Sequence, residues 1–206
     1  GAEEPTEAAR AYAEERMVRP GARVIDVGCG DGTLLNVLRK RKNAKGDGVA
    51  IDVERFEEAL ADGNNLYWED ADEGLSVVPD GHYDIAIISD TLQEVKNPRG
   101  LLHEALRIAD EAIVTFPNFA AYRIRLTLGL TGRLPVSKQL PFQWYDTPNT
   151  HFFTFDDFRA LCAREGIEIK AVRAEAKGFW GRLLLALGFT NLGAERVICR
   201  LARRRP

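Results

Sequence analysis

The feature that most constrains the fold is a short apolar run that breaks into closely spaced glycines. Residues 23–27 read Arg-Val-Ile-Asp-Val, as in a buried strand, and Gly28, Gly30 and Gly32 follow at alternate positions. Residues 33–41 continue with helical periodicity. Strand, glycine turn and helix in this order let a nucleotide-like ligand approach the backbone of an α/β fold, because glycine has no Cβ. The alternative is a plain strand-to-helix turn that binds nothing.

The spacing and charge of this turn favour a cationic ligand over a dinucleotide. The dinucleotide fingerprint is G-x-G-x-x-G, and here the third glycine comes one residue early. Asp26 and Asp31 add carboxylates, which disfavour a diphosphate. S-adenosylmethionine carries an ammonium and a sulfonium group and no phosphate, so we expect this cofactor. The residues predicted to bind it at the turn are Asp26, Gly28, Cys29, Gly30 and Gly32.

The rest of the chain alternates apolar strand patterns with helical ones. Further strands are expected at 46–51, 66–68, 83–89, 112–116, 167–172 and 196–201, and helices at 54–62, after Asn97-Pro98 and after Thr154. This alternation predicts an α/β fold with a doubly wound, mostly parallel sheet. We expect an N-terminal arm over residues 1–19 and one domain over 20–206, with an insertion at 118–150 after the fifth strand.

Acidic residues follow the second and third predicted strands. Asp52 lies about 20 residues beyond the glycine turn, where a carboxylate can accept hydrogen bonds from ribose hydroxyls. It can also cap the next helix, and the two roles are compatible. Asp70 is a candidate partner for an adenine amino group, with Ala71 against the purine, although a solvated acidic loop explains it equally well. Val53 completes this predicted cofactor set.

Ligands of open α/β sheets lie beyond the carboxyl ends of the strands. The loop after the fourth strand, which begins with Ser89 and Asp90, should therefore face the site. The 118–150 insertion should hang over the same edge as a lid or second-substrate surface. Its mixture of basic and aromatic residues suits an anionic small molecule, a partner, or the core of a small subdomain. Its candidate residues are Asn118, Tyr122, Trp144, Tyr145 and Asp146.

Composition excludes several classes of function. A formal net charge of −3 gives no general attraction to nucleic acid. The three cysteines are scattered, which indicates reduced thiols in a cytoplasmic protein and no zinc site. No apolar run reaches transmembrane length. The stretch from Phe179 to Phe189 is too short to span a membrane, and an amphipathic surface helix, a partner contact and core packing all remain open for it.

The sequence resembles a known family at several motifs. The segment VIDVGCGDG, with Asp52, Asp70 and the last two strands, is similar to class I S-adenosylmethionine-dependent methyltransferases, whose Rossmann-like sheet has seven strands with the last antiparallel. The segments DTLQEVKNP, IVTFPNF and LPFQWYDTPN resemble the methionine biosynthesis protein MetW family over roughly residues 20–172.

The resemblance implies a role in methionine biosynthesis beside a homoserine O-acyltransferase. It places Ser89 and Asp90 next to the methyl group, where the family usually has Ser-Gln and this chain has Ser-Asp. Methyl transfer is a direct displacement that needs alignment and no metal. Asp90 and His151 are the predicted catalytic residues; His151, Tyr145 and Asp146 can instead hold the insertion in place. Transfer to a small-molecule acceptor and a non-catalytic accessory role for the acyltransferase both remain open.

Overall fold

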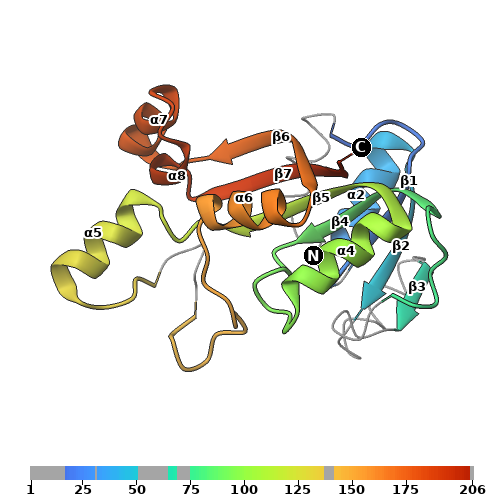
Figure 1. Cartoon of the computed structure of the whole chain (residues 1–206), viewed down its shortest axis with the longest axis horizontal. Coiled ribbons are helices and arrows are strands. Elements are labelled where there is room, and N and C mark those ends of the chain that lie inside the picture. The colour runs from blue at the N-terminus through green and yellow to red at the C-terminus, as the bar shows by residue number, and fades with distance from the viewer. Residues whose placement is uncertain (1–16, 31, 51–64, 69–74, 137–141, 205–206) are drawn as a thin grey trace.

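The computed structural model describes residues 17–30, 32–50, 65–68, 75–136 and 142–204. Its centre is one sheet of seven strands in the order β3-β2-β1-β4-β5-β7-β6 (Figure 1). The strands are β1 (Arg23–Val27), β2 (Lys45–Ala50), β3 (Asn65–Trp68), β4 (Tyr83–Ser89), β5 (Ala109–Pro117), β6 (Ile167–Glu175) and β7 (Arg196–Arg203). The helices are α2 (Thr33–Lys42), α4 (Pro98–Ile108), α5 (Tyr122–Thr131), α6 (Phe155–Arg164), α7 (Gly178–Ala186) and α8 (Thr190–Gly193).

The pairing of the strands confirms the predicted mixed sheet. β1 lies between β2 and β4 and is parallel to both, and β3 and β5 extend the parallel part on either side. β7 runs antiparallel between β5 and β6. The turn after β1 and the loop after β4 therefore lie side by side at the carboxyl edge, where strand order reverses and ligands bind in such sheets.

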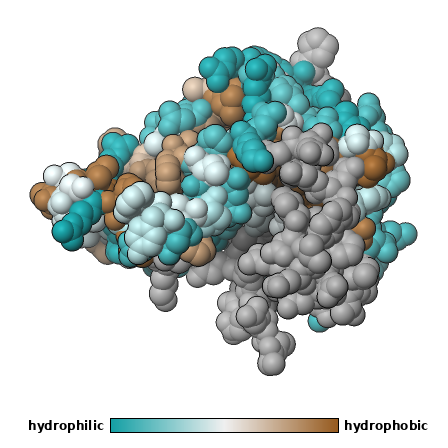
Figure 2. Space-filling view, turned by 90° about the horizontal axis from the view of Figure 1, so that it is seen from below, coloured by the Kyte–Doolittle hydropathy of each residue, from teal (hydrophilic) through white to brown (hydrophobic). Residues whose placement is uncertain are grey.

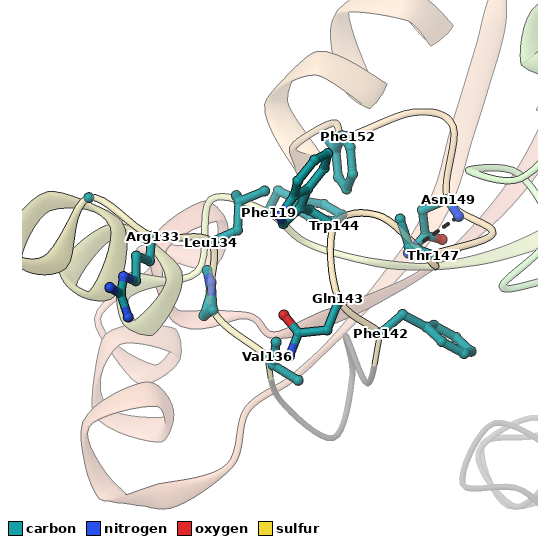
Figure 3. Close-up of a pocket in the computed structure, with 12 residues that line it drawn as sticks. Phe119, Arg133, Leu134, Val136, Phe142, Gln143, Trp144, Thr147, Asn149 and Phe152 are labelled. Carbon is teal, nitrogen blue, oxygen red and sulfur yellow. Dashed lines mark hydrogen bonds between the residues drawn. The ribbon is translucent and has the colours of Figure 1, made fainter.

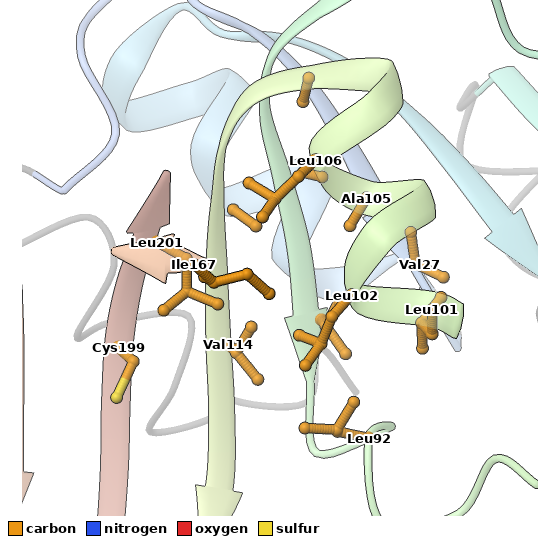
Figure 4. Close-up of a cluster of buried hydrophobic side chains, with 14 of the residues drawn as sticks. Val27, Leu92, Leu101, Leu102, Ala105, Leu106, Val114, Ile167, Cys199 and Leu201 are labelled. Carbon is orange, nitrogen blue, oxygen red and sulfur yellow. The ribbon is translucent and has the colours of Figure 1, made fainter. Parts of the chain in front are cut away.

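Two apolar layers cover the sheet, one on each face. Along β4, Ile85 and Ile87 point to the layer that contains α2, whereas Ala86 and Ile88 point to the layer of α4 and α6. Successive strand residues alternate between faces, so a strand covered on both sides must be apolar throughout. Figure 4 shows Leu101, Leu102 and Ala105 of α4 directed toward the strands.

Helix caps form where the local sequence predicts them. The Asn97 side chain accepts a hydrogen bond of 2.9 Å from the Gly100 N–H at the start of α4. Thr154 and Asp157 form a capping box at the start of α6. The Phe153 ring, just before this helix, lies 6.3 Å from that of Phe158. Short-range side-chain chemistry therefore fixes where both helices begin.

Two helices form in segments whose structure the sequence pattern left open. The first part of the 118–150 insertion forms α5, and no residue of that helix is buried. The Phe179–Phe189 stretch forms α7 and a following turn on the surface, so core packing is excluded for most of its large side chains. The predicted helix at 54–62 lies outside the described residues. In the described ranges, no helix is long and apolar enough to cross a membrane.

Candidate cofactor and acceptor site

The glycine turn after β1 has backbone angles that favour glycine. Gly28, Gly30 and Gly32 have φ of 82°, 54° and 77°, all in the left-handed region. The N–H groups of Gly28 and Cys29 both donate to the Val49 carbonyl, at 2.9 and 3.1 Å. These bonds fix the turn to the end of β2. The predicted cofactor loop is therefore a rigid corner between β1, β2 and α2.

At two glycines, neighbouring side chains pack directly against the backbone of this turn. A Cβ on Gly28 would lie 2.4 Å from the Thr91 Oγ1 atom. A Cβ on Gly48 of β2 would lie 2.6 Å from the Cys29 Sγ atom. Both distances are shorter than real Cβ contacts, so these positions admit no side chain without a shift of the neighbour.

Asp26 is the buried acid of the site. It is 2% exposed, and strand register places it between Gly48 of β2 and Ile87 of β4. Acidic side chains are almost never fully buried unless they are paired. A carboxylate held one residue before the end of β1, with a glycine on the neighbouring strand, is suited to a cationic ligand group.

Asp90 begins the loop after β4 with a strained backbone. Its φ is +52°, which is uncommon for a residue other than glycine. Its carboxylate Oδ2 lies 3.0 Å from the Nη2 atom of Arg196, the first residue of β7. Burial raises the pKa of the Asp90 carboxyl, Arg196 opposes this rise and Glu175 adds to it. About a third of the Asp90 side chain is exposed, but its Oδ1 atom is buried and has no hydrogen-bond partner in the described parts of the chain.

The segment that carries His151 is fastened to the same loop. The N–H groups of Thr150 and His151 donate to the Gln93 carbonyl at 2.9 and 3.0 Å. The Gln93 side chain donates to the Asp90 carbonyl at 2.6 Å. The buried His151 Nε2 atom has no hydrogen-bond partner within the described parts of the chain. The structure therefore links the loops of the two predicted catalytic residues through Gln93.

Asn118 and Tyr122 contact elements of the C-terminal part of the domain. The buried Asn118 side chain accepts bonds from the N–H groups of Ala120 and Phe155, and it donates to the carbonyls of Asn191 and Ala194. Tyr122 lies against α7, since its Cε1 atom would be 3.7 Å from a Cβ on Gly181. Asn118 thus joins β5, α6 and α8.

Trp144 lines an aromatic pocket of about 400 Å³ in the insertion. Figure 3 shows its indole beside Phe119 and Phe152, with Leu134 and Val136 across the opening and Gln143 and Phe142 below. Arg133 also lines the pocket, and Figure 3 shows its guanidinium directed away from the aromatic side chains. Tyr145 and Asp146 are exposed to solvent, and so is most of Trp144 itself, at 73%. The pocket lies on the segment that Thr150 and His151 fasten to the β4 loop.

Ser89 is the last residue of β4, where its carbonyl accepts a bond of 3.1 Å from Thr91 Oγ1. Four predicted cofactor residues lie outside the described residues: Asp52, Val53, Asp70 and Ala71. Their contacts with ribose and adenine stay predictions. The cysteines in the described residues are all buried, and in those residues no group of three acidic, cysteine or histidine side chains could hold a metal ion.

Sequence reasoning missed Thr91, Gly48 and Arg196. Thr91 and Arg196 contact the site only through the fold, so no local pattern marks them. Gly48 did leave a signal, because Gly46 and Gly48 alternate within a strand. Glycines on one face of a strand indicate that another segment approaches closely. Here Gly46 admits Leu35 of α2, and Gly48 admits Cys29.

Comparison with solved structures defines the class of fold. An S-adenosylmethionine-dependent methyltransferase from Mesorhizobium loti superposes with a TM-score of 0.67 at 18% identity, covering 97% of this chain and 100% of that one. A possible histamine N-methyltransferase from Thermotoga maritima gives 0.66 at 20% identity, covering 96% and 89%. The fold is that of the class I S-adenosylmethionine-dependent methyltransferases.

Sequence comparison narrows the class to one family. The family described as methionine biosynthesis protein MetW matches residues 10–196, so the chain belongs to the MetW family. A bifunctional methionine biosynthesis protein MetXA/MetW from Rhodopirellula baltica is 33% identical over 162 residues, which are 74% of this chain and 26% of that protein. This chain therefore spans about a quarter of the length of that relative.

Proposed function

We propose that the protein binds S-adenosylmethionine at the turn after β1 and transfers its methyl group to a small-molecule acceptor in methionine biosynthesis. The observation that carries this proposal is the buried Asp26 carboxylate beside a turn of three left-handed glycines. The left-handed glycines form a turn that other residues would strain, and the carboxylate suits a cationic group. The methyltransferase fold and the family support the same reading.

We assign the site residues to the two ends of this cofactor. Asp26 would face the amino-acid part, with Gly28 and Gly30 allowing close approach. Asp52 and Asp70 would hold the ribose and the adenine. Asp90 would lie near the sulfonium, where its negative charge favours the positively charged cofactor over the neutral product. When bound, S-adenosylmethionine supplies a methyl group that is activated for displacement.

The protein's own contribution to transfer is alignment and proton handling. The bonds from Thr150 and His151 to Gln93 fasten the end of the insertion to the β4 loop, and this attachment would set the distance between acceptor and cofactor. The buried His151 Nε2, which has no partner among the described residues, would accept a proton from an acceptor nitrogen or oxygen that reaches it. The pocket beside Trp144 would bind the apolar part of the acceptor, and Arg133 an anionic part.

Calorimetry tests the cofactor site directly. Wild-type protein is titrated with S-adenosylmethionine and with S-adenosylhomocysteine, and Asp26→Asn is compared with Asp146→Asn, an exposed acid in the insertion. We expect binding of both ligands, weakened by Asp26→Asn and unchanged by the control. A dissociation constant of about 1 mM corresponds to a binding free energy of only about 4 kcal/mol. If wild-type protein binds neither ligand at concentrations up to about 1 mM, the proposal is wrong. Label transfer from methyl-labelled cofactor to a metabolite pool then tests turnover.

A second candidate function is favoured by one comparison. In the Rhodopirellula baltica relative, the name of the protein pairs MetXA with MetW in a single chain. This supports an accessory role in which the cofactor-binding domain associates with a homoserine O-acyltransferase and changes its rate. An acyltransferase assay with and without this protein, at zero and saturating S-adenosylmethionine, tests the role. An acyltransferase rate that this protein leaves unchanged at both cofactor levels would exclude rate regulation.

A further inference from the structure

One end of the molecule exposes large apolar side chains from two helices. In α5, Leu126, Leu128 and Leu130 are 55%, 45% and 83% exposed. The others come from α7 and the turn after it: Phe179, Trp180, Leu183, Leu187 and Phe189. Figure 2 shows apolar side chains in brown at the left end, which in Figure 1 carries α5 and α7. We refer to these eight side chains as the apolar end.

The leucines of α5 are not the inner face of an amphipathic helix. Residues two apart in a helix are separated by about 200° around its axis, so Leu128 lies on the side opposite Leu126, and Leu130, four residues after Leu126, returns to the first side. No residue of α5 is buried by the rest of the domain. A helix that is apolar on several sides is normally covered by other protein or by lipid.

The apolar end is held in a fixed arrangement. α7 and α8 cross so closely that a Cβ on Gly193 would lie 2.9 Å from the Gly181 carbonyl oxygen. The Asn118 side chain donates to the carbonyls of Asn191 and Ala194 and so ties α8 to the end of β5. The first turn of α5 lies against α7 through Tyr122. Such a preorganised surface loses little conformational entropy when a partner binds.

The charged side chains of the two segments that form this end are all positive. Residues 119–136 contain Arg123, Arg125 and Arg133, and residues 176–194 contain Lys177 and Arg182, with no Asp or Glu in either range. The whole chain, by contrast, has a formal net charge of −3. Glu195 offsets part of this charge, since its carboxylate lies 3.5 Å from Arg123. The complementary surface is therefore apolar and bordered by carboxylates.

We propose that the apolar end is the surface on which the homoserine O-acyltransferase docks. The acyltransferase would contact it with an apolar patch of its own that is bordered by Asp and Glu. The inference rests on the accessory role proposed above, which the fused relative supports. Exposed tryptophan, phenylalanine and arginine are typical anchors of protein interfaces. The rigid crossing of α7 and α8 presents Trp180 and Phe179 as such anchors.

The test compares a double variant with a matched control. Leu130→Glu combined with Trp180→Glu places charge on both helices of the apolar end, and glutamate keeps good helix propensity. Val77→Glu is the control, since Val77 is 57% exposed in the segment between β3 and β4. Binding to the purified acyltransferase of the same organism is measured by biolayer interferometry at low and high salt. S-adenosylhomocysteine affinity and thermal melting confirm that both variants are folded.

We expect the double variant to weaken acyltransferase binding at least about tenfold and the control to leave it unchanged. Salt should weaken wild-type binding as well. Equal affinity of wild type and double variant would overturn the proposal. Two other results would also overturn it. In the first, wild-type protein sediments with vesicles that contain phosphatidylglycerol and does not bind the acyltransferase, which indicates that the apolar end binds a membrane. In the second, wild-type protein forms a dimer that the double variant abolishes.

The outcomes also separate this proposal from the cofactor proposal. If wild-type protein binds S-adenosylhomocysteine but does not bind the acyltransferase, the docking proposal fails and the cofactor proposal stands. If the protein binds the acyltransferase through the apolar end but binds neither form of the cofactor, the docking proposal stands and the cofactor proposal fails.

Discussion

The side chain of Thr91 occupies the space that a Cβ on Gly28 would need. Such a Cβ would lie 2.4 Å from the Oγ1 atom of Thr91 and 2.9 Å from its Cγ2 atom. The same hydroxyl group lies 3.3 Å from the Val27 carbonyl and 3.1 Å from the Ser89 carbonyl. Thr91 therefore joins the ends of β1 and β4, and the glycine turn depends on a residue that is distant in sequence.

Replacement of Gly28 by Ala should destabilise the protein through both backbone angle and contact. The φ of +82° costs about 1–2 kcal/mol for alanine, and the contact with Thr91 adds to that cost. Gly81→Ala is the control, since Gly81 has φ +60° and nothing within 4 Å of its Cβ position. Urea unfolding should show a larger loss for Gly28→Ala. Equal losses would mean that Thr91 simply moves aside.

Replacement of Asp90 by Asn should lower the preference for S-adenosylmethionine over S-adenosylhomocysteine. The charge of Asp90 acts on the sulfonium and not on the neutral thioether, so we expect a change of about threefold to tenfold in the ratio of affinities. Because burial raises the Asp90 pKa above its ordinary 3.8, the wild-type preference should fall as the pH drops toward that raised value. Calorimetry from pH 8 to about 5 measures both effects. This role is contradicted if the ratio of the two affinities does not change with pH in the wild type and is the same in the variant.

The capping box at the start of α6 should give a pH-dependent stability. The Thr154 hydroxyl and N–H donate to Asp157 and hold the pKa of its carboxyl below 3.8. A lowered folded pKa stabilises the protein above the ordinary value, and this contribution disappears as the pH falls through the folded pKa. Asp157→Asn should thus cost about 0.5–1 kcal/mol at pH 7. Urea unfolding should show this difference shrinking below pH 3.8, and a constant difference would contradict it.

Replacement of Asn118 by Ala should unfold the junction of β5, α6 and α8. It leaves two N–H groups and two carbonyls without their side-chain partner, among them the buried N–H of Phe155. We expect a loss of about 2–4 kcal/mol. Asn191→Ala is the control, because its side-chain amide donates only to the exposed Asp156 carboxylate. A loss no larger than that of the control would show that water replaces the Asn118 bonds.

Features encoded by neighbouring residues could be predicted from the sequence. The caps at Asn97 and Thr154 need only residues three positions away, and β4 needs only a continuous apolar run. In each case the physical cause lies within a few residues, so the pattern contains the whole explanation.

Features encoded by tertiary contact could not be predicted. Arg196 meets Asp90 only because β7 inserts beside β5, and the two residues are far apart in the chain. α5 was missed because its leucines do not recur at the spacing of one buried face. Asn118 was predicted as a lid residue. Its side chain forms four hydrogen bonds within the domain. Its role toward a substrate stays a prediction.

The position of β7 between β5 and β6 has a consequence for synthesis on the ribosome. All other strands of the sheet are made before residues 196–203, yet β6 is hydrogen-bonded only to this last strand. Until β7 emerges, β5 has an open edge, and open strand edges are sites of aggregation. We expect the nascent chain to need protection at that edge, and its final eight-residue strand to complete the sheet.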